Sequence, residues 1–128
     1  MALIIGKKNT RKIRAQIEEQ CDFNEVKKHN VDVEFKILSP ADLKEIESYG
    51  TQGSENFDLE TQAEMIFDQI VSVDGLKDEA GNPIPYTPDV RKHMIETLWI
   101  RHPILKGFWS VQIGISQADT YKQAKLKN

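Results

Sequence analysis

The N-terminal third of the chain alternates apolar and polar residues with a period of two. In residues 12–18 and again in residues 31–37, the odd positions are apolar and the even positions are polar. Because successive side chains of a strand point to opposite faces, each segment predicts a half-buried β-strand. The intervening segment 21–25 contains Asp and Asn, which favour turns. The pattern therefore predicts an N-terminal β-hairpin.

After residue 38 the spacing becomes that of amphipathic helices. Ser39 is a candidate N-cap and Pro40 suits the first helical position, so a short helix is expected to end near Gly50. In residues 58–72 the apolar residues recur at spacings of three and four, which predicts a longer helix. Thr87 and Pro88 repeat the cap and first-turn proline of a third helix.

A last helix is expected over residues 103–124, whose apolar residues form a broad stripe. We place its start at Pro103 because a residue that precedes proline disfavours helical geometry. Earlier in the chain, Gly81–Asn82 is a turn signal between two short apolar stretches, and it predicts a small second hairpin.

Together these elements predict an α+β fold in one domain of 128 residues, with three to four helices in most of residues 39–124. Residues 1–10 are either a flexible basic arm or a further edge strand, and residues 125–128 are expected to fray.

The composition favours a globular domain, with 39% hydrophobic and 29% charged residues. No apolar run approaches the roughly 20 residues that a membrane span requires. The apolar residues 3–5 are too few for a signal peptide, and the single Cys21 allows no internal disulfide. Disordered, secreted and membrane-spanning classes are therefore disfavoured, and a reducing cytosol is expected.

The formal net charge of −3 conceals an uneven distribution. Residues 1–38 carry eight basic and six acidic side chains, a net charge of +2. Residues 39–86 carry two basic and eleven acidic side chains, or −9, and residues 87–128 carry seven and three, or +4. This asymmetry favours complementary charge contacts, either within the fold or between copies, or else a solvated acidic helix face.

The sequence shows no catalytic constellation. It lacks a nucleophile elbow, a phosphate-binding glycine loop and a His/Cys pair at metal-ligand spacing. We therefore expect neither enzymatic activity nor a cofactor or metal. An alternative function is a small cytosolic regulatory protein that binds nucleic acid through an N-terminal basic cluster, comprising Lys7, Lys8, Arg11, Lys12 and Arg14. The acidic composition makes nucleic-acid binding the weaker hypothesis.

Protein–protein binding fits the remaining features best. Large aromatic and basic residues, of the types enriched at interface hot spots, concentrate in and before the last helix. Candidates there are Trp99, Arg101, Phe108, Trp109 and Ile115, although either tryptophan taken alone is more often a core residue. An acidic face on the 58–72 helix adds Glu60, Glu64 and Asp68, whose mutual repulsion a basic partner would relieve. These residues predict self-association or binding to another protein.

Several short motifs follow one another between residues 71 and 101. A helix expected to end at paired valines precedes an acidic Asp-Glu-x-Gly-Asn-Pro turn and a Pro-Tyr-Thr-Pro helix start. A Trp-hydrophobe-Arg step at residues 99–101 leads into an aromatic helix and a Lys-Asn tail. With the strand segment 26–35, this pattern resembles the tail assembly chaperones of long-tailed, non-contractile (lambda-like) bacteriophages over most of residues 26–128.

The resemblance implies a non-enzymatic protein that acts through protein–protein contacts. Members of that family bind the tape measure protein, keep it soluble and help tail tube subunits polymerise around it. They self-associate in the cytoplasm of the bacterial host and are absent from the finished virion. The implied partners are thus the tape measure protein, the tail tube protein and a longer, frameshifted form of the chain itself.

Overall fold

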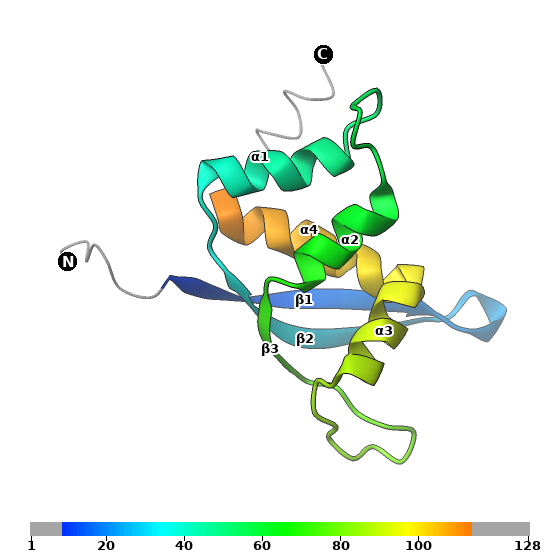
Figure 1. Cartoon of the computed structure of the whole chain (residues 1–128). Helices are drawn as coiled ribbons and strands as arrows, with labels where there is room; N and C mark the ends of the chain where they lie inside the picture. The colour runs from blue at the N-terminus through cyan, green and yellow to red at the C-terminus, as the bar shows by residue number, and fades with distance from the viewer. Residues whose placement is uncertain (1–8, 114–128) are drawn as a thin grey trace.

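A three-stranded antiparallel sheet carries four α-helices in the computed structural model, which describes residues 9–113 (Figure 1). The strands lie in the order β1-β2-β3, with bounds β1 Thr10–Gln20, β2 Val26–Lys36 and β3 Ile70–Asp74. The helices are α1 Pro40–Tyr49, α2 Leu59–Phe67, α3 Pro88–Glu96 and α4 Leu98–Ile113. This arrangement confirms the predicted α+β class.

The predicted N-terminal hairpin is present and is longer than the pattern indicated. β1 and β2 pair from Thr10 opposite Lys36 to Gln20 opposite Val26, and the 3₁₀ turn Asp22–Asn24 joins them. Period-two burial extends over the half of the hairpin that the helices cover. Beyond it both strands are solvated, and Figure 1 shows this end of the hairpin projecting past the helices.

The core lies between one face of the sheet and α4. Phe108 has no exposed area and packs edge-on against Phe35 of β2, with ring centroids 5.5 Å apart. The adjacent Gly107 faces β1, where a Cβ atom would lie 3.4 Å from Cγ2 of Ile13, in ordinary van der Waals contact. α2 and α3 pack against α4, and α1 packs against α2, so the fold has two layers, sheet and helices (Figure 1).

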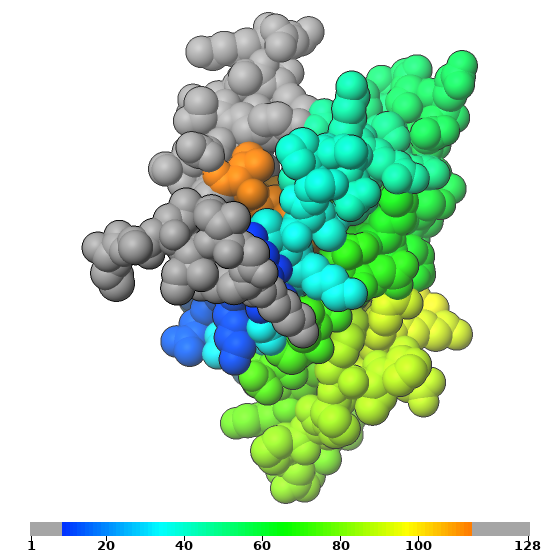
Figure 2. All heavy atoms as spheres, turned by 60° about the vertical axis from the view of Figure 1, so that its left-hand side comes forward, coloured from blue at the N-terminus to red at the C-terminus, as the bar shows by residue number. Residues whose placement is uncertain are grey.

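Both predicted helix caps are confirmed. The Asp42 N–H donates to Ser39 Oγ at 3.3 Å at the start of α1, and the Val90 N–H donates to Thr87 Oγ1 at 3.3 Å at the start of α3. The small hairpin at Gly81–Asn82 is also present, as a single antiparallel bridge between Lys77 and Pro83. In the space-filling view this connection protrudes from one end of the molecule (Figure 2).

The predicted helix over residues 58–72 is wrong in its second half. α2 ends at Phe67, and Ile70–Asp74 forms β3 along the free edge of β2. Two of the three residues 70, 71 and 73 are valines and the third is isoleucine, and such β-branched side chains favour a strand where a partner edge is available. The paired valines therefore lie in a strand rather than at the end of a helix.

The predicted helix break before Pro103 is also wrong. α4 begins at Leu98 and continues through Pro103, while the break between α3 and α4 lies at Thr97, whose backbone is extended. The Thr97 carbonyl accepts from the N–H groups of Ile100 and Arg101 and so closes the first turn of α4. Tertiary contacts of that turn outweigh the local preference of the residue before proline.

Some predictions fall on residues outside the described range. These are most of the N-terminal segment, the end of the last helix, the tail at 125–128 and Ile115. At the N-terminal boundary, Thr10 already belongs to β1, and the Asn9 carbonyl accepts from the Ile37 N–H at 3.0 Å.

Candidate protein-binding surfaces

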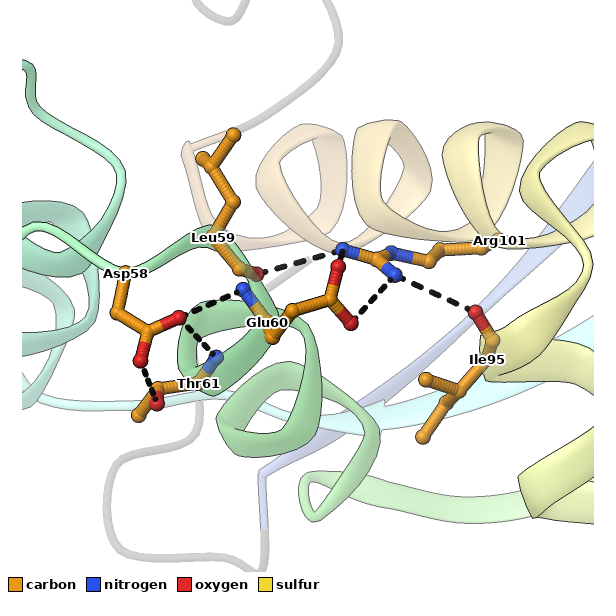
Figure 3. Close-up of polar contacts among 6 residues, drawn as sticks. All are labelled: Asp58, Leu59, Glu60, Thr61, Ile95 and Arg101. Carbon is orange, nitrogen blue, oxygen red and sulfur yellow. Dashed lines mark hydrogen bonds and ion pairs between the residues drawn. The ribbon is translucent and has the colours of Figure 1, made fainter.

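Arg101 is the only charged side chain buried among residues 9–113, with 8% of its area exposed. Its guanidinium makes two hydrogen bonds to the Glu60 carboxylate, at 3.0 and 3.1 Å. It also donates to the carbonyl oxygens of Leu59 and Ile95, each at 3.4 Å (Figure 3). One side chain of α4 thus ties the start of α2 to the end of α3, an arrangement we call the arginine clamp.

Asp58 caps α2 immediately beside the arginine clamp (Figure 3). Its carboxylate accepts from the Thr61 hydroxyl at 2.9 Å and from the N–H groups of Glu60 and Thr61. These hydrogen bonds, that of the Thr61 hydroxyl foremost, lower the pKa of Asp58. The first turn of α2 is therefore held both by its own cap and by α4.

Arg91 of α3 engages the rest of the predicted acidic face. Its guanidinium lies 2.9 Å from a carboxylate oxygen of Glu64 and 2.7 Å from one of Asp68. It also donates to the Glu64 backbone carbonyl at 3.1 Å. The basic groups that relieve the acidic face, as the sequence led us to expect of a partner, therefore come from α3 and α4 of the same chain.

A groove between α2 and α4, the α2–α4 groove, is apolar with a basic rim. It has a volume of about 500 Å³. Its lining comprises Leu59, Gln62, Leu98, Arg101, His102, Leu105, Lys106 and Trp109. Leu98 keeps 68% of its area exposed, and Leu59 is also exposed. Apolar side chains left open to solvent in a concave surface mark binding sites.

A second and larger depression, the α3 groove, lies between the sheet, the β3–α3 connection, α3 and the start of α4. Its volume is about 690 Å³. Apolar residues of its lining include Val31, Leu76, Ile84, Val90, Met94, Trp99 and Ile100. Carboxylates of Glu19, Asp78, Glu79 and Asp89 belong to the same lining, along with Lys77 and two histidines. Trp99 is 43% exposed and contributes a large aromatic surface.

The tip of the β1–β2 hairpin carries the most exposed large apolar residue of the described chain. Phe23 is 97% exposed. Its backbone has φ 61° and ψ 32°, the left-handed region that bulky residues avoid at a cost of about 1–2 kcal/mol. A strained and fully solvated phenylalanine is unfavourable for the isolated chain, and such features concentrate at functional sites.

The predicted candidate residues thus occupy different environments. Glu60, Glu64, Asp68 and Arg101 form ion pairs within the chain, whereas Trp99 and Trp109 line the two grooves. Phe108 lies in the core, where it supports Trp109 edge-on at 5.1 Å and offers no surface to a partner.

Sequence reasoning missed Phe23, Leu98 and Arg91. Phe23 had a visible signal, since it is the one aromatic residue in an otherwise polar turn segment. Leu98 resembled a core position of a helix, and Arg91 gave no signal because its partners are 23 and 27 residues away.

The basic N-terminal cluster is partly engaged by the sheet. Arg14 forms a bidentate pair with Asp32 at 2.8 and 3.2 Å, and this pairing lowers the pKa of Asp32. Lys7 and Lys8 lie outside the described residues.

Metal sites and membrane spans are two further classes of feature to consider in residues 9–113. No group of three or more His, Cys, Asp or Glu side chains there could hold a metal ion. No helix in that range combines the length and apolar character needed to cross a membrane. Comparisons with protein families, with curated proteins and with solved structures find no match to this chain.

Proposed function

We propose that this chain is a tail assembly chaperone of a lambda-like bacteriophage, which binds the tape measure protein, keeps it soluble and promotes tail tube assembly. It acts by protein contacts and self-association in the bacterial host cytoplasm and leaves before the virion is complete. It has no enzymatic activity and uses no cofactor.

One observation supports this proposal above the others. Parts of the motifs that carry the resemblance, between residues 75 and 90 and at residues 99–100, line the α3 groove. From the Asp-Glu-x-Gly-Asn-Pro turn come Asp78, Glu79 and Gly81, and from the Trp-hydrophobe-Arg step come Trp99 and Ile100. Motifs separated in the sequence thus form one apolar surface with carboxylates beside it, which suits a partner segment that has an apolar face and basic flanks.

The test is co-expression with the tape measure protein encoded in the same genome. We expect the soluble fraction of the tape measure protein to rise when this chain is present and the two proteins to co-purify. Trp99→Ser should abolish both effects, because it removes the largest aromatic surface of the α3 groove.

Val71→Thr is the matched control, since it changes an exposed apolar residue of β3 outside both groove linings and keeps β-branching. A tape measure protein that stays insoluble with the wild-type chain would refute the proposal. A DNA or RNA mobility shift at physiological salt would instead support the regulatory alternative.

A further inference from the structure

We infer that this chain self-associates head to tail, with the Phe23 tip of one copy seated in the α2–α4 groove of the next. The inference rests on the self-association that the proposed function includes, and it supplies the contact. It concerns the β1–β2 hairpin and the α2–α4 groove, whereas the tape measure protein is assigned to the α3 groove.

The tip has no partner within its own chain. β1 and β2 remain paired as far as Gln20 and Val26, so the end of the hairpin that carries residues 21–25 projects past the helices (Figure 1). Phe23 is 97% exposed, and Val26 beside it is also exposed. A rigid hairpin that presents a solvated aromatic residue meets the requirements of an interface anchor, because little conformational entropy is lost on docking.

The charge of the tip selects between the two grooves. Glu18 and Glu19 stand opposite Lys28 and Lys27 in the β1–β2 register, so these charges compensate one another. Beyond them the apex carries two exposed acids, Asp22 and Glu25, and no basic residue.

The α2–α4 groove complements this acidic apex. Its lining includes Arg101, His102 and Lys106 and no carboxylate, although Arg101 is already paired with Glu60. The α3 groove has four carboxylates in its lining and would repel the tip. Apolar contact from Leu98 and Trp109, combined with a basic rim, therefore assigns the tip to the α2–α4 groove.

A tip-to-groove contact joins two different surfaces of identical chains. Such heterologous contacts continue from copy to copy and yield rings or open filaments, unlike the closed dimer of a two-fold contact. The stoichiometry of a mixture of a tip-deficient and a groove-deficient variant therefore distinguishes a tip-to-groove contact from a two-fold contact.

The experiment is sedimentation velocity on the purified full chain over a wide concentration range. We expect wild type to associate as its concentration rises. Phe23→Ser on the tip and Leu98→Glu in the groove should each raise the dissociation constant about 30-fold or more, the effect of losing an interface hot spot. Val71→Thr should sediment as wild type does. Both altered residues are exposed, and circular dichroism will check that each variant folds. If Leu98→Glu unfolds, Lys106→Glu takes its place as the groove variant.

Mixing the two deficient variants is the decisive step. Phe23→Ser retains its groove and Leu98→Glu retains its tip, so an equimolar mixture should form a one-to-one dimer and nothing larger. A charge exchange gives a second readout: Glu25→Lys and Lys106→Glu should each weaken association, and the double variant should recover it.

Three results would overturn the inference: a wild-type chain that is monomeric at every concentration, a Phe23→Ser variant that associates as wild type does, or a mixture that remains monomeric. The last two results would leave the proposed function intact. A monomeric wild type would remove its self-association but not tape measure binding, which the co-expression experiment tests separately.

Discussion

The arginine clamp and the hairpin tip differ in how far their side chains find partners within the chain. At the clamp, polar groups from α2, α3 and α4 meet one another, and the Arg101 guanidinium reaches four acceptor atoms of its own chain. At the tip, Phe23 contacts almost nothing and accepts a strained backbone. The charged residues most visible in the sequence thus serve internal structure, while apolar residues in less conspicuous places remain exposed to solvent.

Removing the arginine clamp should have the largest effect on stability. Arg101→Met retains most of the aliphatic packing and loses every hydrogen bond of the guanidinium, leaving the carbonyls of Leu59 and Ile95 without that donor. We expect the free energy of unfolding in urea to fall by about 2 kcal/mol. Glu60→Gln, which keeps an acceptor on a mostly exposed side chain, should cost about 1 kcal/mol. A loss below about 0.5 kcal/mol for Arg101→Met would mean that the clamp is incidental.

Phe23→Gly should separate stability from assembly. Glycine adopts the left-handed conformation of residue 23 without steric cost, so we expect the free energy of unfolding to rise by as much as about 1 kcal/mol. The same variant should lose self-association, because the anchor is gone. Urea titration and sedimentation of one preparation measure both quantities. A destabilised Phe23→Gly would show that the phenylalanine supports its own chain.

Arg91 provides a contrast with Arg101, because it contacts the same acidic helix from a more exposed position. Its side chain is 27% exposed, against 9% for that of Arg101. Solvent weakens such pairs, so Arg91→Met should lower the free energy of unfolding by only about 0.5 kcal/mol. The difference between the two losses measures how much the burial of an arginine, rather than its charge, contributes to the free energy of unfolding. Equal losses would remove the distinction between them.

The smallest effect expected is a dependence on acid pH that originates at the α2 cap. Because the pKa of Asp58 is lower in the folded chain than its ordinary value of 3.8, the folded state favours the ionised carboxylate. That stability is complete above the ordinary value and is lost as the pH falls through the lowered pKa. Asp58→Asn, which still caps a helix, should therefore lose less stability than wild type between neutral and strongly acidic pH. Urea midpoints at several pH values test this, and identical acid losses would exclude Asp58 as a contributor.

The sequence predicted those parts of the molecule that local rules determine. Period-two patterning located β1 and β2, and Ser39 and Thr87 marked two helix starts, because caps and alternation act over a few residues. It failed at Ile70–Asp74, where an available edge of β2 decided between helix and strand. It also failed at Pro103, where contacts of α4 outweighed a local preference.

The candidate surfaces also divide into features that local residue type indicates and features that only the whole fold determines. Residue type drew attention to Trp99 and Trp109, and both line grooves. The pairing of Glu60 with Arg101 spans 41 residues and leaves no trace in local spacing, so sequence patterns present an internal ion pair as a binding feature. Exposure of Phe23 depends on how far the hairpin extends beyond the helices, which is a property of the whole fold.

The central claim is that the residues between 75 and 90 and at 99–100 that line the α3 groove form the surface that binds the tape measure protein. Hydrogen exchange of the chain, free and in complex with the tape measure protein of the same genome, tests it most directly. We expect slowed exchange in the β3–α3 connection and around Trp99, and unchanged exchange along α1. Slowed exchange confined to β1 or α1, with the α3 groove unaffected in the complex, would contradict it.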